Sequence, residues 1–149
     1  MKKKFSIIFF LFILLSSCGY EALYSSKSEI LNIEILDFKG DSRVNSKIIQ
    51  KLNRYKNNSS ELYEVSFETY YTKKESSKNS SGKIENYRLS VISNFIIKKA
   101  GIIKNFSISE NFTMKNIDDE FQELNYENKI KENIADSIVQ KLIIQLKRF

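Results

Sequence analysis

The chain has 149 residues, with 24 Lys and Arg against 18 Asp and Glu, and it contains no His, Pro or Trp. Hydrophobic residues make up 42% of it, which excludes an intrinsically disordered chain, because such chains have too little apolar surface to bury. The lack of His excludes an imidazole base or metal ligand, and the single Cys excludes an intramolecular disulfide or a cysteine zinc cluster. Most familiar enzyme mechanisms are therefore excluded, and we expect no cofactor or metal.

The first 17 residues have the pattern of a secretory signal peptide. Lys2–Lys4 precede an apolar run, Phe5–Leu15, which is shorter than the roughly 20 residues of a transmembrane helix. The run ends in Leu15-Ser16-Ser17-Cys18, which resembles the bacterial lipobox, where the Cys sulfur receives a diacylglycerol before cleavage. We predict lipidation at Cys18; an ordinary signal peptide or an uncleaved anchor is the alternative.

The residue after the predicted lipidation site indicates to which membrane the lipoprotein is sorted. Lipoproteins retained in the inner membrane typically carry Asp there, so Gly19 predicts sorting to the outer membrane, with the lipid as the membrane anchor. Removal of residues 1–17 takes away three Lys and no acid, so the mature charge is 24 − 3 − 18 = +3. So small a charge lacks the basic footprint of a nucleic-acid-binding protein, and we expect no nucleic acid partner.

The mature chain divides into a tether, residues 18–29, and a single domain, residues 30–149. The domain begins with Leu31, Ile33 and Ile35 alternating with polar residues, which predicts a strand. The segment Lys39–Ser42 is typical of a turn that contains helix-capping residues. Apolar residues at spacings of three and four then predict a helix over Ser42–Tyr55.

The middle of the domain is predicted to be mostly strand. The segment Tyr63–Tyr71 alternates between apolar and polar residues, and Lys73–Gly82, which has no apolar residue, is expected to be a mobile loop. Two long strands, Tyr87–Ile97 and Ile102–Met114, follow, with a turn at Lys98–Gly101 between them.

A two-residue turn at Ala100-Gly101 makes the register of this hairpin testable, since the numbers of opposed residues then sum to 201. The resulting apolar pairs all face one way, and such pairs stabilise a sheet by about 0.2–1 kcal/mol each. The pairs are Phe95 with Phe106, Leu89 with Phe112, and Tyr87 with Met114.

The C-terminal part is predicted to be the longest helix. An acidic connection, Asn116–Glu123, precedes it, and its apolar residues recur at a spacing of four. They are Ile130, Ile134, Ile138, Leu142 and Leu146. The order β-α-β-β-β-α predicts an α+β two-layer sandwich, in which two helices pack on one face of a four-stranded, mainly antiparallel sheet.

Two clusters are candidates for a binding site. Asp118-Asp119-Glu120 could bind calcium or perform acid–base chemistry, but a solvated helix start is the simpler interpretation, and we assign no metal or catalytic residue. At the hairpin turn, Lys98, Lys99 and Lys104 flank the apolar pair Ile102-Ile103, an arrangement that suits an anionic amphiphile. The alternative is a charged turn that discourages aggregation at a sheet edge.

The start of the predicted mature chain resembles the lipopolysaccharide-assembly lipoprotein LptE family, especially its alphaproteobacterial type. Members open with Cys-Gly-(aromatic)-x-Pro-Leu-Tyr. This chain matches the motif at five positions and has Ala22 where Pro is usual; the matches are Cys18, Gly19, Tyr20, Leu23 and Tyr24. Over residues 30–148 the resemblance lies in element order and size rather than in residue identities.

The resemblance implies a four-stranded sheet backed by two helices and a function without catalytic residues. An LptE-like subunit sits in the lumen of the LptD β-barrel, supports its assembly, plugs it and assists insertion of lipopolysaccharide at the outer leaflet. Two alternatives are a lipoprotein that carries a lipid or ligand in a closed apolar cavity and a structural envelope lipoprotein. Ile92 and Ile96, on the opposite strand face from Leu89 and Val91, favour a partner that covers the second sheet face.

Overall fold

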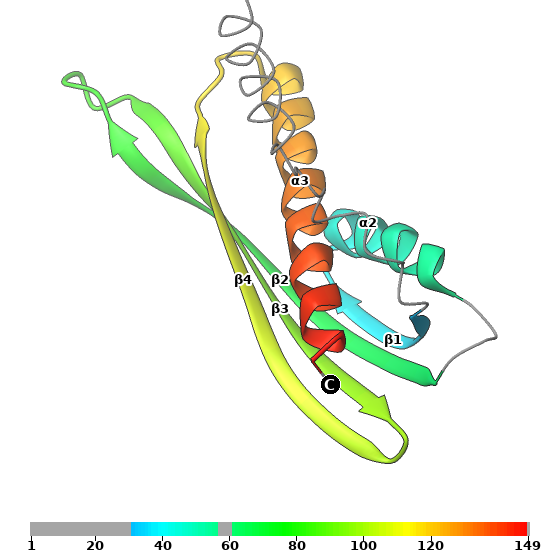
Figure 1. Ribbon diagram of the computed structural model, residues 1–149. Helices are drawn as coiled ribbons and strands as arrows, with labels where there is room; N and C mark the ends of the chain where they lie inside the picture. The colour runs from blue at the N-terminus through cyan, green and yellow to red at the C-terminus, as the bar shows by residue number, and fades with distance from the viewer. Residues whose placement is uncertain (1–30, 57–60, 149) are drawn as a thin grey trace, which may run out of the picture.

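The computed structural model describes residues 31–56 and 61–148 as one α+β domain, shown in Figure 1. The predicted order β-α-β-β-β-α and the two-layer architecture are confirmed. The elements are β1 (Asn32–Gly40), α2 (Ser42–Leu52), the 3₁₀ turn η1 (Asn53–Tyr55), β2 (Leu62–Lys78), β3 (Ile84–Lys99), β4 (Ile102–Lys115) and α3 (Glu120–Leu146). The predicted signal peptide, Cys18 and the tether lie outside the described residues.

The four strands form one mixed sheet in the spatial order β1-β2-β3-β4. β1 runs parallel to β2, and the other two pairs are antiparallel. A parallel neighbour requires a crossover connection, and α2 supplies it between β1 and β2. Both helices lie on the same side of the twisted sheet (Figure 1).

Helix α2 follows a tight entry from β1. The Asp41 side chain accepts a hydrogen bond of 2.9 Å from the Val44 amide, so Asp41 is the N-cap. Gly40 has φ +105°, and a Cβ atom there would clash with the Thr69 carbonyl oxygen on β2. The glycine thus allows the chain to turn into α2 while lying directly against the neighbouring strand.

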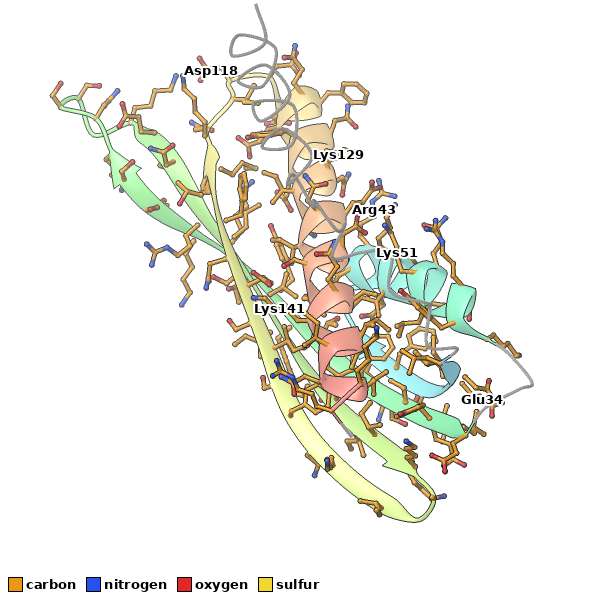
Figure 2. The ribbon with its side chains drawn as sticks, in the orientation of Figure 1. Glu34, Arg43, Lys51, Asp118, Lys129 and Lys141 are labelled. Carbon is orange, nitrogen blue, oxygen red and sulfur yellow. The ribbon has the colours of Figure 1, made fainter. Side chains whose placement is uncertain are left out.

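Helix α3 is the main cover of the sheet. Asp119 caps its first turn by accepting a hydrogen bond of 2.9 Å from the Gln122 amide. The predicted apolar stripe is buried, including Ile134 and Ile138, together with Ala135 and Val139 beside it. Charged side chains such as Lys129 of α3 and Arg43 of α2 are exposed, as Figure 2 shows.

The β3–β4 hairpin has the predicted register. Phe95 lies opposite Phe106, with ring centroids 5.7 Å apart, and the other two predicted pairs are also present. Ala100 (φ +47°) and Gly101 (φ +82°) both have positive φ angles, as a type I′ turn requires. The alternation of the two strands therefore places one apolar face against the helices.

The expectation of a mobile loop over Lys73–Gly82 is wrong. β2 continues through Lys78, paired with β3 as far as Ile84, and only a short turn separates the two strands. Beyond Lys73, which contacts α3, this end of the hairpin extends away from α3 in Figure 1, and most of its residues are exposed. A strand segment that covers no core needs no alternation of apolar and polar residues. Backbone hydrogen bonds to β3 keep this part of β2 extended although its sequence lacks that pattern.

Candidate functional site

The three lysines of the predicted ligand site lie together at the β3–β4 tip, which we define as residues 98–104. They do not share one face of the sheet. In the register, Lys98 lies opposite Ile103 and faces away from the helices, whereas Lys99, opposite Ile102, and Lys104 belong to the helix side. The tip therefore presents one isoleucine and at least one lysine on each of its two faces.

Two of these lysines are paired with acids of β2 and the residue before it. Lys98 Nζ lies 3.0 Å from a carboxylate oxygen of Glu64, and Lys99 Nζ lies 2.9 Å from Glu61. Lys99 also donates a hydrogen bond of 2.9 Å to the Tyr63 hydroxyl and sits 4.6 Å from the centre of that ring. The hydrogen bond to Tyr63 and, second in size, the hydrogen bond to Glu61 raise the pKa of Lys99, so this lysine keeps its charge.

No described helix or strand covers the side of the sheet opposite the helices, and we call it the uncovered face. It is formed by the outward-facing residues of β2, β3 and β4. In the middle of β3, Ser and Asn alternate with Ile, whereas β4 contributes mainly Ser, Thr and Asn, and β2 adds Glu64 and Glu68. For example, Tyr70 lies opposite Ile92, and Ser66 lies opposite Ile96. Its exposed large apolar side chains are Leu62, Tyr70, Ile92, Ile96 and Ile103.

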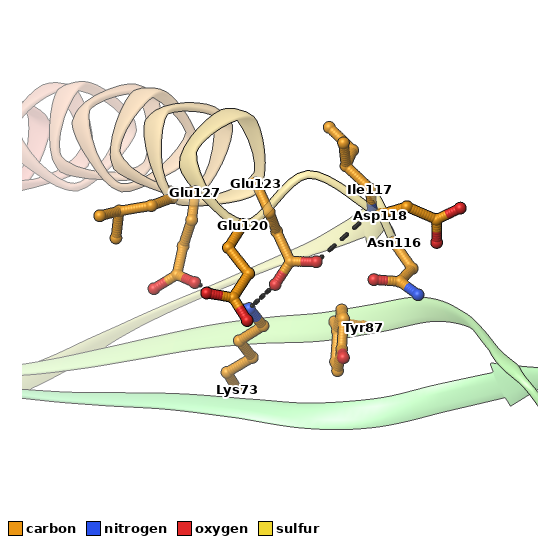
Figure 3. A pocket seen from close by; sticks show the side chains of 9 residues that line it. Lys73, Tyr87, Asn116, Ile117, Asp118, Glu120, Glu123 and Glu127 are labelled. Atoms are coloured by element: carbon orange, nitrogen blue, oxygen red, sulfur yellow. Dashed lines mark hydrogen bonds and ion pairs between the residues drawn. The ribbon is translucent and has the colours of Figure 1, made fainter.

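An open cleft of about 460 Å³ lies between the extended part of the β2–β3 hairpin and the start of α3 (Figure 3). Lys73 stands in it, with Nζ 2.6 Å from Glu123, 2.9 Å from Glu127 and 4.4 Å from the centre of the Tyr87 ring. Burial favours the neutral amine, but hydrogen bonds to the two glutamates outweigh it and raise the pKa of Lys73. Lys73 thus offsets part of the negative charge of the cleft, which Glu120 also lines.

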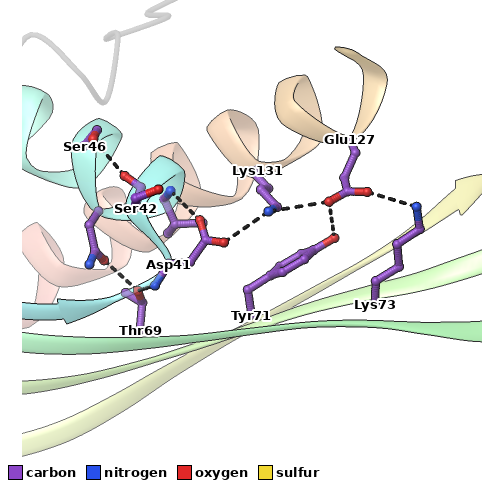
Figure 4. A network of polar contacts seen from close by, with 10 residues as sticks. Asp41, Ser42, Ser46, Thr69, Tyr71, Lys73, Glu127 and Lys131 are labelled. Carbon is purple, nitrogen blue, oxygen red and sulfur yellow. Dashed lines mark hydrogen bonds and ion pairs between the residues drawn. The ribbon is translucent and has the colours of Figure 1, made fainter. Parts of the chain in front are cut away.

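Glu127 also links the cleft to a second set of polar contacts, shown in Figure 4. The Tyr71 hydroxyl donates a hydrogen bond of 2.9 Å to Glu127, and Lys131 Nζ lies 3.5 Å from Glu127 and 3.1 Å from Asp41. Burial works against ionisation of Glu127, yet hydrogen bonds from Lys73 and Tyr71 keep its pKa below the usual value. Burial and the same hydrogen bond raise the pKa of Tyr71.

The geometry makes this network structural. Each charge has an opposite charge beside it, and the contacts join α2, α3 and β2 where helix and sheet diverge. In the acidic cluster, Asp118 forms an ion pair with Lys83, and Asp119 is the N-cap of α3. Among residues 31–56 and 61–148, no three Cys, Asp or Glu side chains gather in a way that could hold a metal ion.

Sequence reasoning found the lysine tip but missed the polar network. Glu127 and Lys131 are four residues apart on one helix, a local signal of an ion pair that could have been read. Asp41 lies 90 positions from Lys131, and no local pattern joins them. No described helix combines the length and apolarity needed to cross a membrane.

Comparison with known proteins identifies the fold. No family model matches the chain, and no curated protein matches it. The crystal structure of rare lipoprotein B from Shewanella oneidensis is similar, with a TM-score of 0.56 and 12% identity over 78% of this chain and 98% of that one. The solution structure of uncharacterized lipoprotein B from Nitrosomonas europaea has a TM-score of 0.50 and 11% identity, covering 80% of this chain and 89% of the other. At these identities the similarity establishes a shared fold.

Proposed function

We propose that this chain is an outer-membrane lipoprotein that acts as the LptE-like subunit of an LptD-like β-barrel. In this role it occupies the barrel lumen and assists the insertion of lipopolysaccharide, without being an enzyme. The proposal draws on the lipobox at Cys18, the LptE-like opening that follows it, and the fold shared with rare lipoprotein B of Shewanella oneidensis.

The observation that carries the proposal is the uncovered face. A sheet whose second face holds several half-exposed apolar side chains is typical of a surface that meets a partner. Here Ser, Thr, Asn and the carboxylates of Glu64 and Glu68 lie among them, and the interior of a large outer-membrane barrel is itself polar, so such a mixed face suits a lumen better than lipid. The helix face, in contrast, is filled by side chains with no exposed surface such as Val91 and Ile138, which favours this role over a ligand carrier with a closed cavity.

Purification of the membrane-extracted protein, with mass spectrometry of co-purifying barrels, tests this role. An Ile92→Asp/Ile96→Asp variant should fold normally, because both side chains are exposed, and should lose the barrel. Ile144→Asp on α3 is the matched control, since Ile144 is equally exposed but lies on a different surface. Equal recovery of the barrel with both variants would refute the proposed role of the uncovered face.

The lysine tip is the proposed contact for anionic groups, either lipopolysaccharide phosphates or acidic groups of the lumen. Lys98→Glu/Lys99→Glu/Lys104→Glu should lower lipopolysaccharide binding, and the wild-type affinity should fall as salt rises. A matched control reverses Lys74, Lys78 and Lys83 of the β2–β3 hairpin, which lie at the other end of the sheet. If both triple variants bind as the wild type does across a salt series, the tip lysines have no such role.

The lipid anchor has its own test. The intact mass of the membrane-bound form should correspond to loss of residues 1–17 and addition of lipid at Cys18. Cys18→Ala should abolish both changes, because the chain has no other Cys. An unmodified full-length chain in the membrane fraction would contradict the prediction.

A further inference from the structure

The two outer strands of the sheet, β1 and β4, differ in how their free edges are protected. β1 has 9 residues, a bulge between Ile35 and Asp37, and the charged side chains of Glu34, Asp37 and Lys39. Shortness, bulges and charges are the features by which proteins keep an edge from pairing with another chain. β4 has 14 residues and pairs with β3 without a register shift. In Figure 1 it runs along the margin of the sheet opposite β1.

The β3–β4 turn fixes which residues of β4 face the free edge. A two-residue turn places a hydrogen-bonded pair directly beside it, here Lys99 with Ile102, and such pairs recur at every second residue. The residues of β4 between them direct their N–H and C=O groups away from β3. They are Ile103, Asn105, Ser107, Ser109, Asn111 and Thr113, none of them charged. Within residues 31–56 and 61–148, no strand other than β3 pairs with β4, so this edge is open.

The six edge residues are complementary to themselves. When a second β4 lies antiparallel with its Ser109 opposite Ser107, all six residues of each copy find a partner in hydrogen-bonded pairs. The other pairs are Asn105 with Asn111 and Ile103 with Thr113. The charged residues of β4 meet no like charge in this register, because Lys104 lies opposite Phe112, Glu110 opposite Phe106, and Lys115 opposite Gly101.

The helix side leaves room for an added strand at the centre of this register. An open groove of about 260 Å³ lies between the middle of β4 and the last turns of α3, and Ser107, Ile108, Ser109 and Ile144 are among the residues that line it. In the self-complementary register Ile108 lies opposite Ile108 of the other copy, so the two-fold axis passes beside this groove. Helix α3 therefore does not block the part of the edge where the two strands would meet.

We propose that the β4 edge pairs with β4 of a second copy of this chain, which joins the two sheets about a two-fold axis at Ile108. A second copy fits this edge because its own residues pair every edge-directed backbone group and bring no like charges together. The inference does not rest on the proposed function. It concerns the chain outside a barrel, and it uses the edge of β4 while leaving the uncovered face exposed.

Disulfide formation between two single-cysteine chains tests the register. Both are mature chains with Cys18→Ser, which removes the native thiol; one carries Ser107→Cys and the other Ser109→Cys. In the proposed pairing their Cα atoms lie about 5.5 Å apart, within the range of a disulfide. A mixture of Ser107→Cys and Thr113→Cys chains is the matched control, because position 113 pairs with 103 in this register. After mild oxidation we expect several-fold more covalent dimer in the first mixture than in the control.

Sedimentation of the mature chain is a second measurement. Ser109→Pro deletes an N–H group that faces the free edge and keeps the bonds to β3, since proline is tolerated on the outer side of an edge strand. We expect its dimer dissociation constant to be at least about tenfold higher than that of Ser109→Ala, because each copy loses a hydrogen bond. Circular dichroism checks that the proline variant is folded, and the disulfide result does not depend on this variant.

Two results overturn the proposal. One is a mature chain that stays monomeric at every concentration tested and gives equal amounts of covalent dimer in the two mixtures. The other is oxidation in cells that joins Ser107→Cys to a different protein in place of a second copy, which assigns the edge to that partner. Recovery of the barrel by the uncovered face is measured separately, so the two proposals fail independently.

Discussion

Truncation of Ile138 to Ala tests whether α3 stabilises the sheet through its buried stripe. Ile138 has no exposed surface and belongs to the core that α3 shares with the sheet and α2. The substitution removes three buried carbon groups. At about 0.8 kcal/mol each, the lost free energy of transfer from water to the core is roughly 2.4 kcal/mol. With the cavity left behind, we expect the free energy of unfolding to fall by about 2–5 kcal/mol. Urea unfolding of the mature chain should show a midpoint lower by roughly 1–2 M, with an unchanged slope.

The same helix offers a matched control. Ile144 is 49% exposed, so Ile144→Ala deletes the same atoms where few neighbours surround them. We expect a loss of about 0.5 kcal/mol or less for this variant. Equal losses for the two variants would mean that the assignment of buried and exposed faces of α3 is wrong.

Two further predictions concern the entry to α2 and the polar network. Gly40→Ala should lower the stability of the fold clearly more than Gly101→Ala does. Both glycines have positive φ, but only at position 40 would the new Cβ meet a backbone oxygen. Thermal unfolding of the two variants tests this, and equal decreases in the melting temperature would refute it. Glu127 has a folded pKa below its unfolded value of about 4.3, so its contribution to stability is present above that value and is lost as pH falls through the folded pKa. Glu127→Gln should therefore be less stable than the wild type at pH 7, with the difference shrinking below about pH 4; a difference that stays constant with pH would contradict the ion-pair assignment.

The sequence alone determined the features that depend on near neighbours. The apolar stripe of α3 and the register of the β3–β4 hairpin follow from periods of 3.6 and 2 and from one two-residue turn. Residues Lys39–Ser42 likewise indicated a capped start of α2, and the structure identifies Asp41 as the cap. The lysine tip could be located for the same reason, because a turn brings residues 98 and 104 together within a few positions. Features that arise from residues close together in the sequence can therefore be predicted from local patterns.

Features that depend on contacts between distant segments become visible only in the folded chain. The polar half of β2 is a strand because β3 pairs with it, although its residues have the composition of a loop. The bond between Asp41 and Lys131, and the pairing of Lys98 with Glu64, join residues whose separation gives no periodic signal. The start of β1, the β3–β4 tip and the end of α3 lie at one end of the domain. The start of β1 lies there because β1 pairs in parallel with β2, which a sequence pattern does not encode.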